Sequence, residues 1–310
     1  MTALLSFREA IRQLYAKYDT YMISIWKFLL AIASFLMING KMGFLEKLDS
    51  IFVVLILALF CSFLPVNAIV LASTALILGH LYGLSLPALI VGGGILIIVL
   101  LLYFGTVPQT GYVLVVTMLA LALGMPCMIP LVFGLISGPV AAAAICFGTV
   151  SFYTLRAVTG VADMSASAGN ASAAEESKAL VENVKHILES VLKEEKLVLM
   201  LITMIAVLLV VYLIRRMAVK HAWTIAIGAG TLTFLSVILM GSLLLGHAGD
   251  IPGLIIGTAF SVMIAFGVKF FLFHVDYSRT MNVQFEDGDY YYYVKAIPKI
   301  KKGREERGDD

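Results

Sequence analysis

The sequence predicts an all-α polytopic membrane protein with about eight transmembrane helices, some broken by proline or glycine, and a small cytoplasmic β-hairpin at the C-terminus. The main observation is that residues 50–155 contain no Asp, Glu, Lys or Arg, whereas a surface that faces water needs charge. In addition, 61% of the 310 residues are hydrophobic and 14% are charged, against about 45–50% and about a quarter in soluble domains. The apolar residues form runs long enough to cross a bilayer.

Five segments follow from the distribution of charge along the chain. The first has apolar and charged side chains interleaved, which is typical of a helix lying on a membrane surface; a frayed start to the first span is the alternative. The segments are a cytoplasmic amphipathic N-terminal helix (1–20), transmembrane helices 1–5 with broken helices (21–156), an extracytoplasmic loop with an amphipathic helix (157–196), transmembrane helices 6–8 (197–274) and a cytoplasmic tail with the β-hairpin (275–310).

The uncharged block predicts four crossings. Glycine and proline interrupt the block, and the crossings are expected near 51–80, 86–104, 111–126 and 128–156. The first of them is too long for one straight perpendicular helix. We expect it to kink or divide at Pro65, because proline removes a backbone hydrogen bond. The side-chain amide of Asn67 can then bond the backbone groups that are left without a partner.

The polar segment 157–196 predicts a helix from about residue 173 that runs into the next span at Leu197. Ser172 and Glu175 have the spacing of a capping box, and apolar residues recur behind them at helical spacing. We favour packing of this helix on the membrane surface or on neighbouring loops, and the docking of a partner is the alternative.

The basic residues predict the orientation. Arg215, Arg216 and Lys220 follow one span, and several more cations follow the last span. Both groups are cytoplasmic by the positive-inside rule, because two spans separate them. The N-terminus is then cytoplasmic and segment 157–196 is outside. Three cations oppose this orientation, since it places them outside: Lys41, Lys47 and Arg156.

Two interrupted stretches are the candidates for a transport pathway. Broken helices in corresponding places mark substrate sites in many transporters. The alternative, which we weigh slightly higher, is that glycine and proline simply allow membrane helices to pack closely. The pathway candidates are Pro65, Asn67, Pro126, Pro130, Gly134, Gly138 and Pro139.

The tail predicts a β-hairpin, because the favoured turn pair Asp287-Gly288 separates two strand-like runs. Such a hairpin could bind a cytoplasmic protein by strand addition or aromatic stacking. An interfacial anchor of tyrosine and lysine is the equally weighted alternative. The candidate partner-binding residues are Phe285, Tyr290, Tyr291, Tyr292, Tyr293 and Lys295.

Several function classes are disfavoured. The chain has no nucleophile-elbow, zinc-protease or P-loop motif, so we expect no enzyme and no catalytic residue. Its three cysteines lie in apolar runs without a paired spacing, so we expect neither a metal site nor a cofactor. The spans contain no carboxylate, which argues against an ordinary proton-driven antiporter. A net charge of +2 gives no indication of a nucleic-acid partner.

The C-terminal region resembles a family of uncharacterised Gram-positive bacterial membrane proteins. These share the pattern V-D-Y-S-R-T followed by V-Q-F-E-D-x-x-Y-Y-Y-Y-V-K-A-x-P-K, which here begins at Val275 and at Val283. Members are often labelled ABC-transporter permease. Residues 64–87 are also similar to the re-entrant segments of DedA-like lipid-carrier proteins, but the acidic and arginine residues that those proteins carry there are absent from this sequence.

Together these features lead us to expect a non-enzymatic transport-type protein of the bacterial cytoplasmic membrane, with both termini in the cytoplasm. It would be a permease-like subunit or a carrier of a lipid or small solute, with the lipid bilayer as its surroundings. The alternative is a membrane scaffold that recruits a cytoplasmic partner through the tyrosine-rich hairpin. The sequence leaves the substrate and the oligomeric state open.

Overall fold

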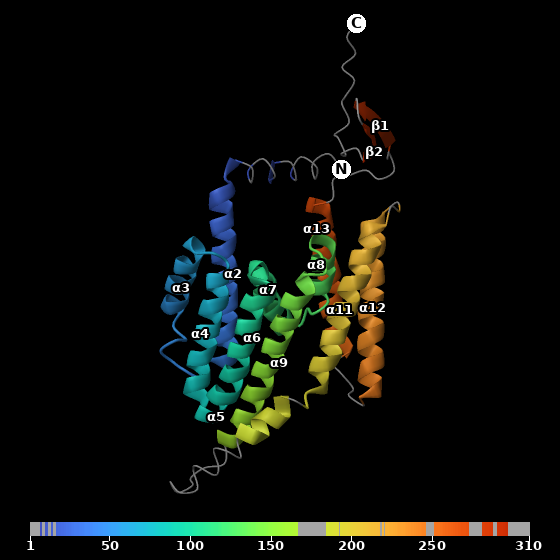
Figure 1. The fold of residues 1–310 in the computed structure, drawn as a ribbon. Helices are drawn as coiled ribbons and strands as arrows, with labels where there is room; N and C mark the ends of the chain where they lie inside the picture. Colours follow the sequence, from blue (N-terminus) through green and yellow to red (C-terminus); the bar gives the residue numbers. More distant parts are fainter. Residues whose placement is uncertain are drawn as a thin grey trace, which may run out of the picture.

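The computed structural model describes residues 7, 10, 11, 14, 17–166, 184–191, 193–217, 219, 221–245, 251–272, 281–287 and 290–296. In this part of the chain, seven helices are long and apolar enough to cross a membrane, which confirms the helical, multi-pass fold class. Figure 1 shows them as one bundle, with the beginning of α2 and the end of α13 at the same end.

The described helices are α2 (Asp19–Met42), α3 (Ile51–Phe63), α4 (Asn67–Leu84), α5 (Leu86–Ala88), α6 (Gly94–Thr106), α7 (Gly111–Ala122), α8 (Met128–Ile136), α9 (Ala141–Ala166), α11 (Glu195–Arg216), α12 (Ala222–Leu244) and α13 (Ile251–Leu272). A π-helical segment, Leu89–Gly93, joins α5 to α6, and a 3₁₀ turn, Pro108–Thr110, precedes α7.

Helices α3 and α4 form a helical hairpin rather than one kinked crossing. At its tip, Lys27 of α2 donates to the Leu64 carbonyl at 3.0 Å. At its base, Asn39 of α2 donates to Leu48 O at 2.9 Å and lies 3.0 Å from His80 Nε2. Thus α3 runs antiparallel to α2, and α4 runs back beside it. We call this α3–α4 unit the first hairpin.

The expected crossing over 51–80 therefore differs from the structure. Proline divides it, as expected, but the two halves return to the same end of the bundle. Leu64, which precedes Pro65, is extended with ψ 167°, as a residue before proline prefers. Helix α3 has 13 residues and is only about 20 Å long, shorter than the apolar layer of about 30 Å.

Helices α7 and α8 form the second hairpin. The rings of Tyr112, near the start of α7, and Phe133, near the end of α8, have centroids 5.9 Å apart, so the two helices are antiparallel. Helix α7 ends in a Schellman motif: Gly124 has φ +74°, its N–H donates to Leu121 O at 3.1 Å, and the next N–H donates to Ala120 O at 2.9 Å. Pro126 follows and prevents further helix.

The structure therefore differs from the expected crossings at 111–126 and 128–156. Helix α7 has 12 residues and turns back at residues 123–127. Pro130 breaks nothing, because it lies in the first turn of α8, where its missing N–H has no helical partner to lose. The break falls instead after Ile136, where Ser137 is extended, and α9 begins at Ala141.

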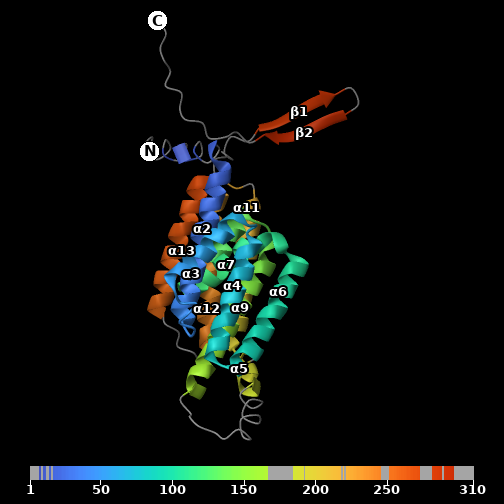
Figure 2. The ribbon, with the colours of Figure 1, turned by 90° about the vertical axis from the view of Figure 1, so that its left-hand side faces the viewer.

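The two hairpins enter the bundle from opposite ends. Gly111, at the base of the second hairpin, lies against Asn67, at the tip of the first: a Cβ on this glycine would stand 2.7 Å from Asn67 Oδ1. Tyr103 joins the same place, because its hydroxyl lies 2.8 Å from both Asn67 Oδ1 and Pro108 O. Figure 2 shows α4, α6 and α7 side by side in the same part of the bundle.

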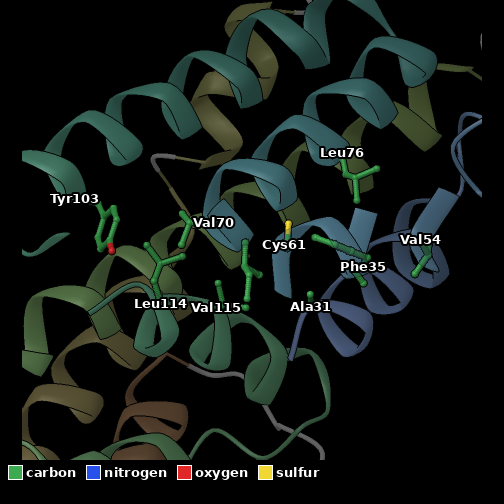
Figure 3. Packing of buried hydrophobic residues seen from close by; sticks show 11 residues of the cluster. Ala31, Phe35, Val54, Cys61, Val70, Leu76, Tyr103, Leu114 and Val115 are labelled. Atoms are coloured by element: carbon green, nitrogen blue, oxygen red, sulfur yellow. The ribbon is translucent and has the colours of Figure 1, made fainter. Parts of the chain in front are cut away.

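Packing around the first hairpin is dense. Its buried cluster joins residues of α2, α3, α4, α6 and α7, and Figure 3 shows their side chains converging between the helices. Phe35, Ala58 and Ile69 have 0% exposure. Thus α3, though too short to cross a bilayer, is held on two sides by buried apolar contact. The Cys61 thiol fills a gap in this cluster, as expected for an uncharged filler.

The three successive glycines do not interrupt the third crossing. Residues 86–106 are helical throughout, with a π-helical segment at Leu89–Gly93. Gly92 lies in close packing, because a Cβ there would stand 3.1 Å from a Leu81 methyl and 3.3 Å from a Val158 methyl. Gly92 therefore serves close helix packing, as small residues commonly do in membranes.

The helix predicted from residue 173 is described only over 184–191; its expected start lies outside the described residues. It does not run straight into the next span, since Glu194 has ψ 88° and α11 begins at Glu195. Ile187 is buried among Met42, Ile77, Leu81 and other residues of α2, α4 and α9. This helix therefore packs on the end of the bundle.

Beyond α13, the described residues include strands β1 (Met281–Asp287) and β2 (Tyr290–Ala296). They are antiparallel, with Asp287 opposite Tyr290 and Phe285 opposite Tyr292. Asp287 of the expected Asp287-Gly288 turn ends β1, and residues 288 and 289 follow it. These two residues, and the rest of the tail, lie outside the described part of the chain.

Candidate functional site: a cavity between the two hairpins

A cavity of about 530 Å³ lies inside the bundle. Helices α2, α4, α6, α7 and α9 surround it, so one arm of each hairpin forms part of its wall. Its volume falls in the range of small-molecule sites, roughly 300–1,000 Å³. The apolar lining includes Met37, Ile38, Val99, Leu100 and Met118.

Hydroxyl groups interrupt the apolar lining. Ser34 donates to Leu30 O at 2.7 Å and Ser151 donates to Phe147 O at 2.8 Å, which are bonds within their own helices. Ser73 differs: it is 7% exposed, and its Oγ has no hydrogen-bond partner within the described residues. A buried hydroxyl without a partner costs about 1–3 kcal/mol, so this position favours a polar group inside the cavity.

Two cations line the cavity, Lys41 and Arg156. Lys41 is in the last turn of α2, beside Met42. Arg156 lies at the same level on α9, because its neighbours Leu155 and Val158 pack in the cluster that contains Met42. The cavity thus has a cationic region at the end of the bundle where α2 finishes, and an apolar interior.

Three other cations within or beside the spans have partners in the protein. Lys27 caps the Leu64 carbonyl. Arg215 donates to the Leu135 carbonyl at the end of α8, and Lys269 donates to the Thr224 hydroxyl. By contrast, the side chains of Lys41 and Arg156 make no hydrogen bond or ion pair with any other described residue.

The predicted pathway residues lie elsewhere. Among the seven, none lines the cavity, although Gly124, next to the second break, does. Pro65 and Asn67 form the tip of the first hairpin, and Pro126 lies in the tip of the second. Gly134 of α8 is packed against Val211 of α11, while Pro130, Gly138 and Pro139 belong to α8 and to the link that follows it.

The predicted partner-binding residues lie on the two strands. Phe285 is on β1, and Tyr290, Tyr291, Tyr292, Tyr293 and Lys295 are on β2. Tyr292 is 47% exposed and Val294 is 46% exposed. The hairpin and the cavity are therefore separate candidate sites.

No group of three His, Cys, Asp or Glu side chains lies close enough to hold a metal ion within the residues that the structure describes. Comparison of the chain with protein-family models, with curated proteins and with solved structures found no match. The cavity and its cations are consequently the main basis for an inference about function.

The cavity could not be found by looking for proline and glycine. Its wall is built from ordinary apolar side chains of five helices, and no local pattern distinguishes them. The available signal was charge: Lys41 and Arg156 are two of the three cations that oppose the orientation given by the positive-inside rule.

Proposed function

We propose that this protein is a non-enzymatic transport protein of the bacterial cytoplasmic membrane, a permease-like subunit or a carrier of a lipid or small solute. The observation that carries the proposal is the pair of helical hairpins that enter from opposite ends and contribute α4 and α7 to one cavity. Interrupted helices around a site between related halves are characteristic of secondary transporters.

The architecture suits a carrier more than a static bundle. Each hairpin contains at least one helix too short to cross a bilayer, and no continuous helix runs through its tip. The tip of the first is held by the Lys27–Leu64 bond at 3.0 Å and the Tyr103–Asn67 bond at 2.8 Å, and the tip of the second lies on Gly257 of α13. Such units can rock against the longer helices without breaking a helix, which alternating access requires.

In this proposal both termini are cytoplasmic. Helix α2 begins and α13 ends at the same end of the bundle (Figure 1). Arg215 and Arg216, which end α11, lie at that end too, and the positive-inside rule places them in the cytoplasm. The cationic region around Lys41 then faces the outside. The first hairpin enters from outside and the second from the cytoplasm.

The proposal is tested by cysteine labelling. In a chain with Cys61, Cys127 and Cys146 replaced by alanine, Met118→Cys places one thiol on the cavity wall. A carrier opens its cavity to each side in turn, so we expect a membrane-impermeant maleimide to label this thiol from either side of oriented vesicles. Leu232→Cys on α12, 70% exposed and expected to face lipid, is the control that should resist labelling. Labelling of Met118→Cys from one side only, or from neither, would contradict a carrier.

The second candidate function is a membrane scaffold that binds a cytoplasmic protein through the tyrosine-rich hairpin. It is supported by the pairing of β1 with β2 and by the exposure of Tyr292 and Val294. Strand addition at such an edge is a common mode of peptide recognition. Deleting residues 281–310 should then remove a co-purifying partner while the spans stay folded; retention of every partner would exclude this function.

A further inference from the structure

We infer that the cavity binds an anionic amphiphile, with its headgroup at Lys41 and Arg156 and its hydrocarbon chain in the apolar interior. This inference rests on the proposed function, since it names the class of molecule that the carrier would move. The site is defined by its two cations, by the hydroxyl of Ser73 and by the apolar wall between α4 and α7.

The charge distribution favours an anion. Lys27, Arg215 and Lys269 each have a partner within the described chain. Lys41 and Arg156 share one cavity and have no such partner. Two like charges beside one cavity repel each other, and a bound phosphate or carboxylate replaces that repulsion by charge-assisted hydrogen bonds.

The apolar interior of the cavity favours a hydrocarbon chain as part of the ligand. The surface of the cavity is predominantly apolar, from Met37 of α2 to Leu100 of α6 and Met118 of α7. A small hydrophilic anion would leave this wall in contact with water, whereas a lipid chain gains free energy with each methylene that it buries there. An amphiphile matches both parts of the cavity at once.

The position of the two cations indicates how a lipid headgroup could enter the cavity. Lys41 is exposed and is in the last turn of α2, at the level where lysine side chains reach headgroups. In the proposed orientation, this level is the outer leaflet, where the positive-inside rule leaves few basic residues. The two cations are therefore placed to take an anionic headgroup from the outer leaflet.

The test is binding by the purified full chain in a nonionic detergent, measured by native mass spectrometry. The probes are hexadecyl phosphate, hexadecanoate, hexadecanol and inorganic phosphate. We expect both anionic amphiphiles to bind, and hexadecanol and inorganic phosphate to bind weakly. Whichever of hexadecyl phosphate and hexadecanoate binds more tightly identifies the headgroup. Lys41→Gln and Arg156→Gln should each weaken anionic binding about tenfold, the loss of one charge-assisted bond.

Two controls make the test specific. Lys47→Gln removes an exposed cation from the same end of the bundle but not from the cavity, so it should leave binding unchanged. Leu100→Trp fills the interior and should weaken the amphiphiles while leaving both cations in place. Each variant should keep the unfolding temperature of the unliganded parent.

Three results would overturn the inference: equal binding of hexadecanol, full competition by inorganic phosphate, or an equal loss with Lys47→Gln. Binding without transport in reconstituted vesicles would leave the inference standing and remove the carrier function. Transport of a solute without binding of either anionic amphiphile would leave the carrier function standing and overturn the inference.

Discussion

The Nε2 atom of His80 lies 3.0 Å from the Oδ1 atom of Asn39, and this pair joins the end of α2 to the end of α4. His80 Nδ1 accepts the Leu45 N–H at 3.3 Å, so Nε2 carries the proton and donates to Asn39. The Asn39 amide in turn donates to Leu48 O. This chain of bonds fixes the base of the first hairpin and the link that precedes it.

The coupling between these two residues can be measured. Asn39→Leu and His80→Leu should each lower the free energy of unfolding, because each leaves a buried polar partner unsatisfied. A double-mutant cycle in mild detergent should give a coupling of roughly 0.5–2 kcal/mol, the range for hydrogen bonds between membrane helices. Additive effects of the two substitutions would show that the bond contributes nothing to the base of the hairpin.

Lys27 should determine the stability of the first hairpin's tip. Lys27→Met removes the donor to the Leu64 carbonyl and should destabilise the protein by about 1.5–3 kcal/mol, the cost of losing a charged hydrogen bond. Lys27→Arg, which keeps a donor, should lose less. Thermal unfolding measures the difference, and equal losses for the two variants would argue against the bond.

Gly111 should not tolerate a side chain. Gly111→Ala puts a methyl group 2.7 Å from Asn67 Oδ1 and 2.8 Å from Tyr103 Oη, so it should separate the two hairpins and destabilise the protein. Gly105→Ala is the matched control on α6, since nothing lies within 4 Å of its Cβ. That control should be neutral or stabilising by up to about 1 kcal/mol, because alanine favours helix over glycine. Opposite signs of change in unfolding free energy are expected; two stabilised variants would refute the contact.

The tip of the second hairpin permits the same comparison. A Cβ at Gly257 of α13 would overlap the carbonyl oxygen of Gly124, whereas one at Gly267, on the same helix, meets nothing within 4 Å. Gly257→Ala should therefore displace the tip, lower stability and reduce transport, because Gly124 lines the cavity. Gly267→Ala should change neither property. A tolerated Gly257→Ala would place the hairpin tip elsewhere.

The sequence predicted the helical class and most helix boundaries, because a stretch without charge leaves few alternatives to a membrane. It also predicted that the chain breaks at Pro65 and before Pro126. The direction of the chain after Pro65 was not predicted, because it is set by contacts between distant residues, such as Lys27 with Leu64 and Asn39 with His80. A proline removes one hydrogen bond but carries no information about which way the next helix runs.

The candidate site was anticipated only in part. The interrupted stretches do belong to units that enclose the cavity, but the residues at the interruptions serve capping and packing, as Asn67 does beside Tyr103 and Gly134 beside Val211. On α4 the cavity wall lies one to three turns away from the break at Pro65, and on α7 it extends from Leu114 to Gly124 in the turn itself. Its cations, Lys41 and Arg156, were recognised as exceptions in charge placement, and only the fold brings them to one cavity.

The most direct measurement of the central claim is the sidedness of four single cysteines in the chain without native cysteines: Glu46→Cys, Leu86→Cys, Gln109→Cys and Gly138→Cys. With hairpins that enter from opposite ends, an impermeant reagent should label positions 46 and 86 from one side of the membrane and positions 109 and 138 from the other. If positions 46 and 86 are labelled from opposite sides, residues 51–84 form a crossing, and the two-hairpin account of the cavity is wrong.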